Sequence, residues 1–214
     1  MGESRGPLGE PGHLNTGVAH NARVWNYWIG GRDNHPVDQA VGEQVATMFP
    51  VIRAVARADR DFLGRAVRFL AGERGIRQFL DVGTGLPTLD NTHDIAQRIA
   101  PEPRIVYVDN DPVVLAHARA LLTIVRIMAT LPSGSCLALT HPTTDLGGEG
   151  NVVAMRFWNE NATPPITARG RAEITAFFEG LDLLDPGLVS CAQWRARPRA
   201  GAVLPQCGAV AVKP

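Results

Sequence analysis

The sequence predicts an α/β domain built around parallel strands. Between residues 78 and 122, short β-branched runs alternate with helical patterns, and glycine, proline or aspartate residues separate them. A strand, a helix and a second strand at this spacing form a right-handed crossover unit. With 214 residues, 45% of them hydrophobic, the chain is long enough to bury one proper core, so we expect a single such domain.

Composition narrows the classes of function. The 21 Lys and Arg residues balance 21 Asp and Glu residues, so we expect no nucleic-acid partner. The three cysteines lack any metal-binding spacing and predict reduced thiols, with neither a disulfide framework nor a metal site. No apolar run approaches the roughly 20 residues that span a bilayer, and no signal peptide is visible. We therefore expect a cytoplasmic protein without a membrane partner.

The N-terminal part predicts a tail followed by helices. Residues 1–17 are rich in glycine, proline and polar residues, which predicts a disordered tail before a domain over residues 18–214. An aromatic segment predicts a short helix over residues 24–29, ended by a glycine pair. A proline in the first turn starts a second helix over residues 36–49. Apolar residues at helical spacing predict a third, amphipathic helix over residues 51–70.

The central part alternates between strands and helices. A short apolar run over residues 78–82 stops at the turn Gly83-Thr84-Gly85, which predicts a strand entering a turn. Good N-capping residues precede a predicted helix over residues 94–99. A β-branched run predicts a strand over residues 104–109, and an Asp-Pro start predicts a helix over residues 113–122.

The C-terminal part is less regular. A turn precedes a predicted strand over residues 135–140, and helices are predicted over residues 152–159 and 171–178. Two late strands, over residues 181–189 and 208–212, would complete the sheet.

The glycine turn is the clearest sign of a ligand site. Glycines at Gly83 and Gly85 let a ligand approach the backbone closely, and the following helix offers free amide groups. The dinucleotide fingerprint needs a third glycine where Thr88 stands. This departure argues against a nicotinamide-dependent oxidoreductase, which remains an alternative.

Two carboxylates flank this turn. Asp109, at the end of the second strand, can accept hydrogen bonds from both ribose hydroxyls, whereas Asp111 already caps the next helix. Asp81 can meet an ammonium group, or it can hold the loop through backbone amides. No Arg or Lys lies between Arg77 and Arg98. These charges favour S-adenosylmethionine over a pyrophosphate-containing cofactor.

Several strings resemble an actinobacterial S-adenosyl methyltransferase family that was long catalogued as a domain of unknown function. They are NARVWNYWIGGRDN at residues 21–34, FLDVGTGLPT with NTH at residues 79–93, and YVDNDP at residues 107–112. Residues 172–194 and 212–214 are similar too. The resemblance implies a Rossmann-like class I methyltransferase sheet with helices on both faces and an N-terminal helical lid. It also implies S-adenosylmethionine as cofactor and a small-molecule methyl acceptor.

The resemblance and the turn together give the candidate site, although no catalytic base is identifiable. Single histidines such as His93 and His141 are more often structural than catalytic. The predicted cofactor-binding residues are Tyr27, Asn34, Asp81, Gly83, Thr84, Gly85, Asp109 and Asn110.

The resemblance has one break. In the family, a third strand, a helix, the central fourth strand and most of another helix follow the helix that ends near Thr123. Here Thr123 leads into residues 124–128, which resemble the end of that last helix, so two strand-helix units are predicted to be missing. Either the strand before Gly83 pairs with the strand near Leu137, or a parallel edge stays open. A shortened, non-catalytic relative with weak or no cofactor binding is therefore also an alternative.

Overall fold

Helices and strands make up most of the part of the chain that a computed structural model describes. That part comprises residues 16–83, 85–86, 90–108, 118–196 and 203–214. The predicted N-terminal tail lies outside these ranges except for its last two residues. Within them, no helix is both long and apolar enough to cross a bilayer.

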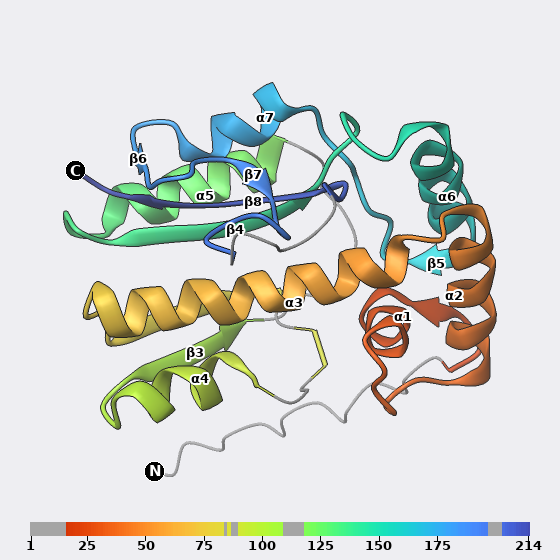
Figure 1. The fold of residues 1–214 in the computed structure, drawn as a ribbon, viewed down its shortest axis with the longest axis horizontal. Helices are drawn as coiled ribbons and strands as arrows, with labels where there is room; N and C mark the ends of the chain where they lie inside the picture. The colour runs from red at the N-terminus through yellow and green to blue at the C-terminus, as the bar shows by residue number, and fades with distance from the viewer. Residues whose placement is uncertain (1–15, 84, 87–89, 109–117, 197–202) are drawn as a thin grey trace, which may run out of the picture.

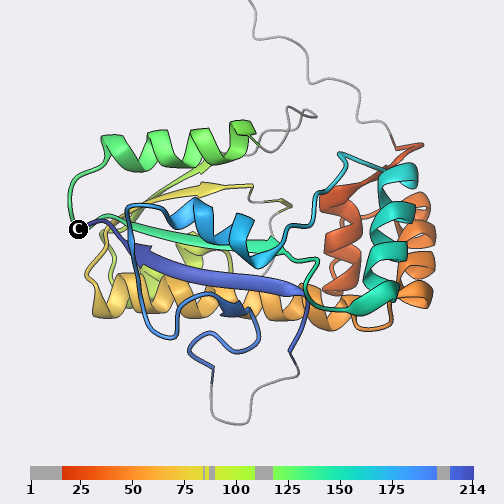
Figure 2. The same ribbon diagram turned by 90° about the horizontal axis from the view of Figure 1, so that it is seen from above.

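Five elements from the two halves of the chain form one side of the molecule (Figures 1 and 2). They are β1 (Ala19–His20), α1 (Asn21–Trp28), α2 (Pro36–Met48), α6 (Gly148–Asn161) and β5 (Ala162–Thr163). The two short strands pair in parallel, and α2 packs against both α1 and α6. The helix predicted over residues 24–29 begins earlier because the His20 side chain accepts a hydrogen bond from the amide of Ala22 and caps it.

A buried ion pair ties this N-terminal region together. The Asp38 carboxylate, fully buried, accepts hydrogen bonds from Arg23 Nε at 2.8 Å and from the backbone amides of His20 and His35. Burial by itself raises the pKa of Asp38, but these donors outweigh it and hold the pKa below the ordinary value. The charged carboxylate is therefore the form that the fold stabilises.

Replacing this carboxylate is expected to destabilise the protein in a pH-dependent way. Asp38→Asn leaves the buried Arg23 without its counter-charge, so we expect the free energy of unfolding at pH 7 to fall by roughly 3–5 kcal/mol. Because the pKa of Asp38 is lower in the folded than in the unfolded protein, wild type has the full stabilisation at pH values above the unfolded pKa of 3.8. It loses this stabilisation as the pH falls through the folded pKa. Urea unfolding at pH 7 and pH 3 measures the difference.

The exposed ion pair of Glu43 with Arg53 is the control. Glu43→Gln should lower the free energy of unfolding by about 1 kcal/mol or less. An equal loss of stability at Asp38 and Glu43 would contradict the prediction.

A long helix crosses the centre of the molecule. It is α3 (Ile52–Arg68), and a turn of π-helix, η1 (Phe69–Glu73), continues it past the predicted end at residue 70. Its apolar stripe includes Val55 and Phe62, which are 3% and 2% exposed. The stripe contacts both β8 (Gln206–Val212) and α4 (Thr92–Ile99), so α3 supports two separate parts of the fold.

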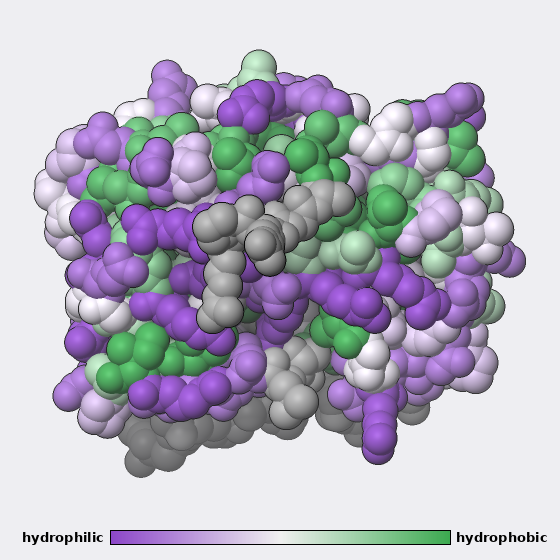
Figure 3. All heavy atoms as spheres, in the orientation of Figure 1, coloured by the Kyte–Doolittle hydropathy of each residue, from purple (hydrophilic) through white to green (hydrophobic). Residues whose placement is uncertain are grey.

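The predicted strands on either side of α4 are confirmed. They are β2 (Gln78–Val82) and β3 (Arg104–Val108), and they pair in parallel with Gln78 opposite Arg104. Two cross-strand pairs of apolar side chains on one face are exposed, namely Leu80 with Val106 and Val82 with Val108. Three of them, Leu80, Val82 and Val106, line the cavity described below. On the outer surface, Figure 3 shows further apolar side chains over β3 and α4. This half-sheet therefore leaves apolar surface uncovered.

The late strands form a second sheet and do not complete the first. In it β8 pairs antiparallel with β4 (Cys136–Pro142), β6 (Asp182–Leu183) and β7 (Val189–Ser190). The single strand predicted over residues 181–189 is wrong. Pro186 lacks a backbone donor and Gly187 has a φ of 78°, so a turn divides the segment into β6 and β7.

Helices lie on both sides of the strands. In Figure 2, α5 (Ala118–Thr130) lies on one side and α3 on the other. The short helix α7 (Arg171–Thr175) and the 3-10 turn η2 (Ala176–Phe178) match the predicted helix over residues 171–178, and η2 contacts α5. The predicted helix end at residue 122 is wrong, because the helix runs on through Thr123. Its apolar residues Ile124, Ile127 and Met128 keep helical spacing and line the interior.

The two sheets do not join among the described residues. There, β2 pairs with β3 and β4 pairs with β8, and no ladder connects β2 to β4. The sequence leaves two arrangements possible, one in which β2 pairs with β4 and one in which the edge of β2 stays open. The described strands show the second. The facing edges of β2 and β4 border the cavity described next.

Candidate functional site

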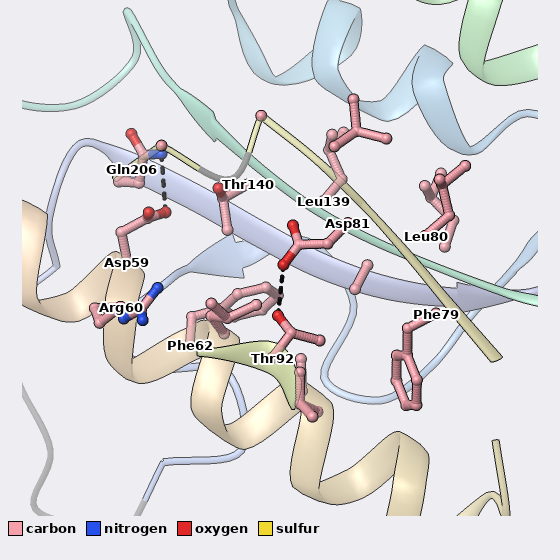
Figure 4. A pocket seen from close by; sticks show the side chains of 18 of the residues that line it. Asp59, Arg60, Phe62, Phe79, Leu80, Asp81, Thr92, Leu139, Thr140 and Gln206 are labelled. Atoms are coloured by element: carbon pink, nitrogen blue, oxygen red, sulfur yellow. Dashed lines mark hydrogen bonds between the residues drawn. The ribbon is translucent and has the colours of Figure 1, made fainter. Parts of the chain in front are cut away.

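A cavity of about 1560 Å³ lies between β2 and β4. Its lining comes from β2, α3, β4, α1 and α6, and it includes residues of the glycine turn (Figure 4). Pockets for a single small molecule commonly measure roughly 300–1,000 Å³, so this space exceeds the needs of one ligand. The excess volume follows from the missing ladder between β2 and β4.

The glycine turn opens toward this cavity. Gly83 and Gly85 have φ values of 74° and 63°, a conformation that L side chains rarely adopt. A Cβ at either position would meet nothing within 4 Å, and both residues line the cavity. The Gly83 amide donates to the carbonyl of Val108 at 2.8 Å, which ties the turn to the end of β3. Glycine is thus needed here for backbone conformation, and the space beside it is accessible to a ligand.

The carboxylate of Asp81 is held beside the turn. Thr92 Oγ1, on the first residue of α4, donates to Asp81 Oδ2 at 2.5 Å (Figure 4). A capping box between Asn91 and Asp94 fixes this end of the helix. The sequence predicts N-capping residues at this helix start but no contact of Thr92 with Asp81. The structure gives the capping role to Asn91 and leaves the buried Thr92 hydroxyl to orient Asp81.

Asp59 lines the same cavity from α3, and sequence analysis missed it. Gln206 Nε2 donates to its Oδ1 at 3.1 Å, and the Cys191 thiol lies 3.9 Å from the same oxygen. Burial raises the pKa of Asp59 above its ordinary value, against the opposing effect of these donors. A signal was present in the sequence: Asp59 stands four residues after Val55, on the apolar stripe of an amphipathic helix.

Two predicted contacts in the N-terminal signature lie away from the cavity lining. The Tyr27 hydroxyl donates to Glu43. The Asn34 amide donates to Asn26 Oδ1 and to the Gly31 carbonyl, both at 3.0 Å. The assignment of Tyr27 and Asn34 as cofactor contacts stays a prediction. Other residues of this region reach the cavity instead, including His20, Asn21, Trp25 and Asn26.

Three further predicted contacts, Thr84, Asp109 and Asn110, lie outside the described residues. Their assignment also stays a prediction.

The two histidines singled out earlier have local partners and do not line the cavity. His93 Nδ1 lies 2.6 Å from the Tyr107 hydroxyl, which also accepts the His93 backbone amide at 2.9 Å. The His141 ring stacks on Phe177 and contacts Arg169. These contacts favour structural roles for both rings.

Comparison with known proteins points to one family. A family model described as S-adenosyl methyltransferase matches residues 8–125 and 123–213. The two matched segments meet at residues 123–125, where the sequence analysis places the break. No curated protein matches the chain.

Two solved structures are similar to this chain. A DUF574 family protein from Streptomyces avermitilis has 32% sequence identity and a TM-score of 0.87, and the match covers 94% of this chain and 100% of that one. A candidate methyltransferase from Thermobifida fusca has 30% identity and a TM-score of 0.82, with 95% and 98% of the two chains covered. These similarities extend over nearly the whole of each chain.

Proposed function

This chain belongs to the S-adenosyl methyltransferase family, and we propose that it binds S-adenosylmethionine at the glycine turn and methylates a small molecule. One observation carries the proposal: the left-handed turn at Gly83 and Gly85 opens to a cavity beside the fixed carboxylate of Asp81. When bound, S-adenosylmethionine supplies an electrophilic methyl group on a sulfonium centre.

The residues at the turn fit this cofactor. The absence of a Cβ at Gly83 and Gly85 leaves space for a ligand to approach the backbone. Asp81 offers a carboxylate to the ammonium group of the methionine part, and Thr92 orients it. Asp109 and Asn110 follow β3 in the sequence, and we propose that they contact the ribose and adenine.

The protein's own contribution to methyl transfer is positioning and exclusion of water. Asp81 orients the methionine part of the cofactor, and the glycine turn lets the cofactor lie close to the backbone. The cavity lining from α1, which includes Trp25, supports the role of a helical lid over the reacting groups. A closed lid keeps water from competing with the acceptor.

Two strand-helix units of the family are proposed to be absent after Thr123. The open edges of β2 and β4, the large cavity between them and the junction of the matched segments support this proposal. The same open edges favour a second candidate function, a shortened relative that binds the cofactor weakly or not at all. Part of the pocket wall would then be lacking.

Calorimetric titration with S-adenosylhomocysteine separates the two candidates. We expect the wild-type chain to bind it, and Asp81→Asn to weaken binding roughly tenfold or more, because a hydrogen bond to a charged group contributes about 1.5–3 kcal/mol. Asp182→Asn, at an exposed carboxylate on β6, should leave the affinity unchanged.

Absence of heat with the wild-type chain at high ligand concentration would contradict the proposal and favour the shortened, non-catalytic relative. Binding of a nicotinamide dinucleotide in its place would favour the oxidoreductase alternative.

A further inference from the structure

A carboxylate stands where the apolar pattern of α3 calls for an apolar side chain. Asp59 lies between Val55 and Phe62 on the buried stripe of the helix, and it is half-buried against β4 and β8. Placing a charged group there costs free energy unless other groups compensate it. Its position inside the cavity therefore needs an explanation beyond packing.

The donors around Asp59 compensate it only in part. Gln206 and Cys191 supply two hydrogen bonds, both to Oδ1, whereas a carboxylate accepts about four. The charged and titratable groups near it are Arg60, on the same helix, and Cys191, whose thiol is kept neutral because burial raises its pKa. The Arg60 guanidinium donates to the carbonyl of Asp90, toward the start of α4. The carboxylate thus retains capacity for a further donor from the cavity side.

Asp59 and the proposed cofactor site share one cavity. Figure 4 shows Asp59 on α3 and Asp81 on β2 as separate carboxylates among the lining residues, each with its own hydrogen-bond donor. Asp81 is engaged by Thr92 beside the glycine turn, whereas Asp59 is held by Gln206 on β8 and by the Cys191 thiol. The cavity therefore offers a second anchoring point that the cofactor contacts described above do not use.

We propose that Asp59 binds the N–H or O–H nucleophile of the methyl acceptor and takes up its proton. This inference rests on the proposed function and gives the acceptor a chemical class, an amine or a hydroxyl compound. As the acceptor nitrogen or oxygen forms its bond to the methyl carbon, the carbon–sulfur bond breaks and its electron pair stays on sulfur. The acceptor proton passes to the Asp59 carboxylate, which becomes a neutral carboxylic acid.

The surroundings of Asp59 suit this role. Burial favours the neutral carboxylic acid and so makes the carboxylate a stronger proton acceptor than one in water. The side-chain amide of Gln206 donates a hydrogen bond to Oδ1 of Asp59 and so holds the carboxylate in place. A general base needs this combination of fixed position and raised basicity.

Sinefungin tests the inference without knowledge of the acceptor. This analogue carries a primary amine where S-adenosylmethionine carries its methyl group, so its ammonium group lies at the place where the acceptor meets the cofactor. We expect wild type to bind sinefungin roughly tenfold more tightly than S-adenosylhomocysteine at pH 7.5, as a hydrogen bond between charged groups would give. In Asp59→Asn this ratio should fall to about one, with the affinity for S-adenosylhomocysteine unchanged.

A control variant and a pH dependence test whether the preference for sinefungin comes from Asp59. Asp61→Asn, at an exposed carboxylate two residues along α3, should keep the wild-type ratio. The wild-type ratio should rise with pH as Asp59 ionises, above the ordinary carboxyl range because burial raises its pKa. This measurement does not depend on the folding of any variant.

A preference for sinefungin that survives Asp59→Asn, or a ratio independent of pH in wild type, overturns this inference and leaves the proposed function standing. Failure of wild type to bind S-adenosylhomocysteine overturns both.

Discussion

Gly83→Val is expected to weaken S-adenosylhomocysteine binding at least roughly 100-fold, a loss of about 2.7 kcal/mol. The Gly83 backbone has a φ of 74° and lines the cavity, so a branched side chain would occupy the space through which the ligand reaches the turn. Because a Cβ there meets nothing within 4 Å, the variant should still fold. Its stability should fall only by the backbone strain, about 1–2 kcal/mol. Calorimetry and urea unfolding measure the two effects separately.

Gly180→Val provides the matched control for this variant. Gly180 has a φ of 76° and equally open surroundings, but it does not line the cavity. It should show the same loss of stability with unchanged ligand affinity. If both variants lost binding equally, general strain would explain the effect and the turn would not be the binding site.

Trp158→Ala is expected to lower the free energy of unfolding by roughly 3–5 kcal/mol. Trp158, on α6, is 1% exposed, and its ring centroid lies 5.2 Å from that of Trp28 on α1. Removing the indole would open a void between two helices that come from opposite halves of the chain. Urea unfolding followed by circular dichroism measures the change.

Trp158→Phe separates packing from hydrogen bonding at this position. Among the described groups, the Trp158 indole nitrogen is buried and has no hydrogen-bond partner. Phenylalanine keeps most of the volume and removes this polar atom, whose burial costs about 1–3 kcal/mol, so it should destabilise much less than alanine. Val153→Ala, at a position on α6 that is 43% exposed, should change stability by about 0.5 kcal/mol or less. Equal losses from alanine and phenylalanine at Trp158 would contradict the packing explanation.

Features written in local sequence were predicted well. The strand β2 has the predicted bounds, Gln78–Val82, because an apolar run and a glycine turn are both local signals. The helix predicted over residues 94–99 is α4, which begins two residues earlier, at Thr92, because Asn91 is its N-cap. Gly83 and Gly85 lie in the predicted turn, where glycine readily adopts the positive φ that the structure shows.

Two predictions of element bounds were wrong. The segment predicted as one late strand forms β6 and β7, because each pairs with β8 on its own side of a turn. The helix predicted to end at residue 122 continues as α5, since an apolar periodicity gives no stop signal at Thr123.

The sequence by itself determined that a glycine turn with Asp81 follows a strand, and that Asp109 follows the next strand. Only the tertiary structure decided that Thr92 orients Asp81, that Tyr27 turns to Glu43, and that β2 and β4 do not pair. Turn geometry depends on neighbouring residues and can be inferred from them. The direction of a side chain and the partner of a strand depend on contacts between residues far apart in the chain, which no local pattern specifies.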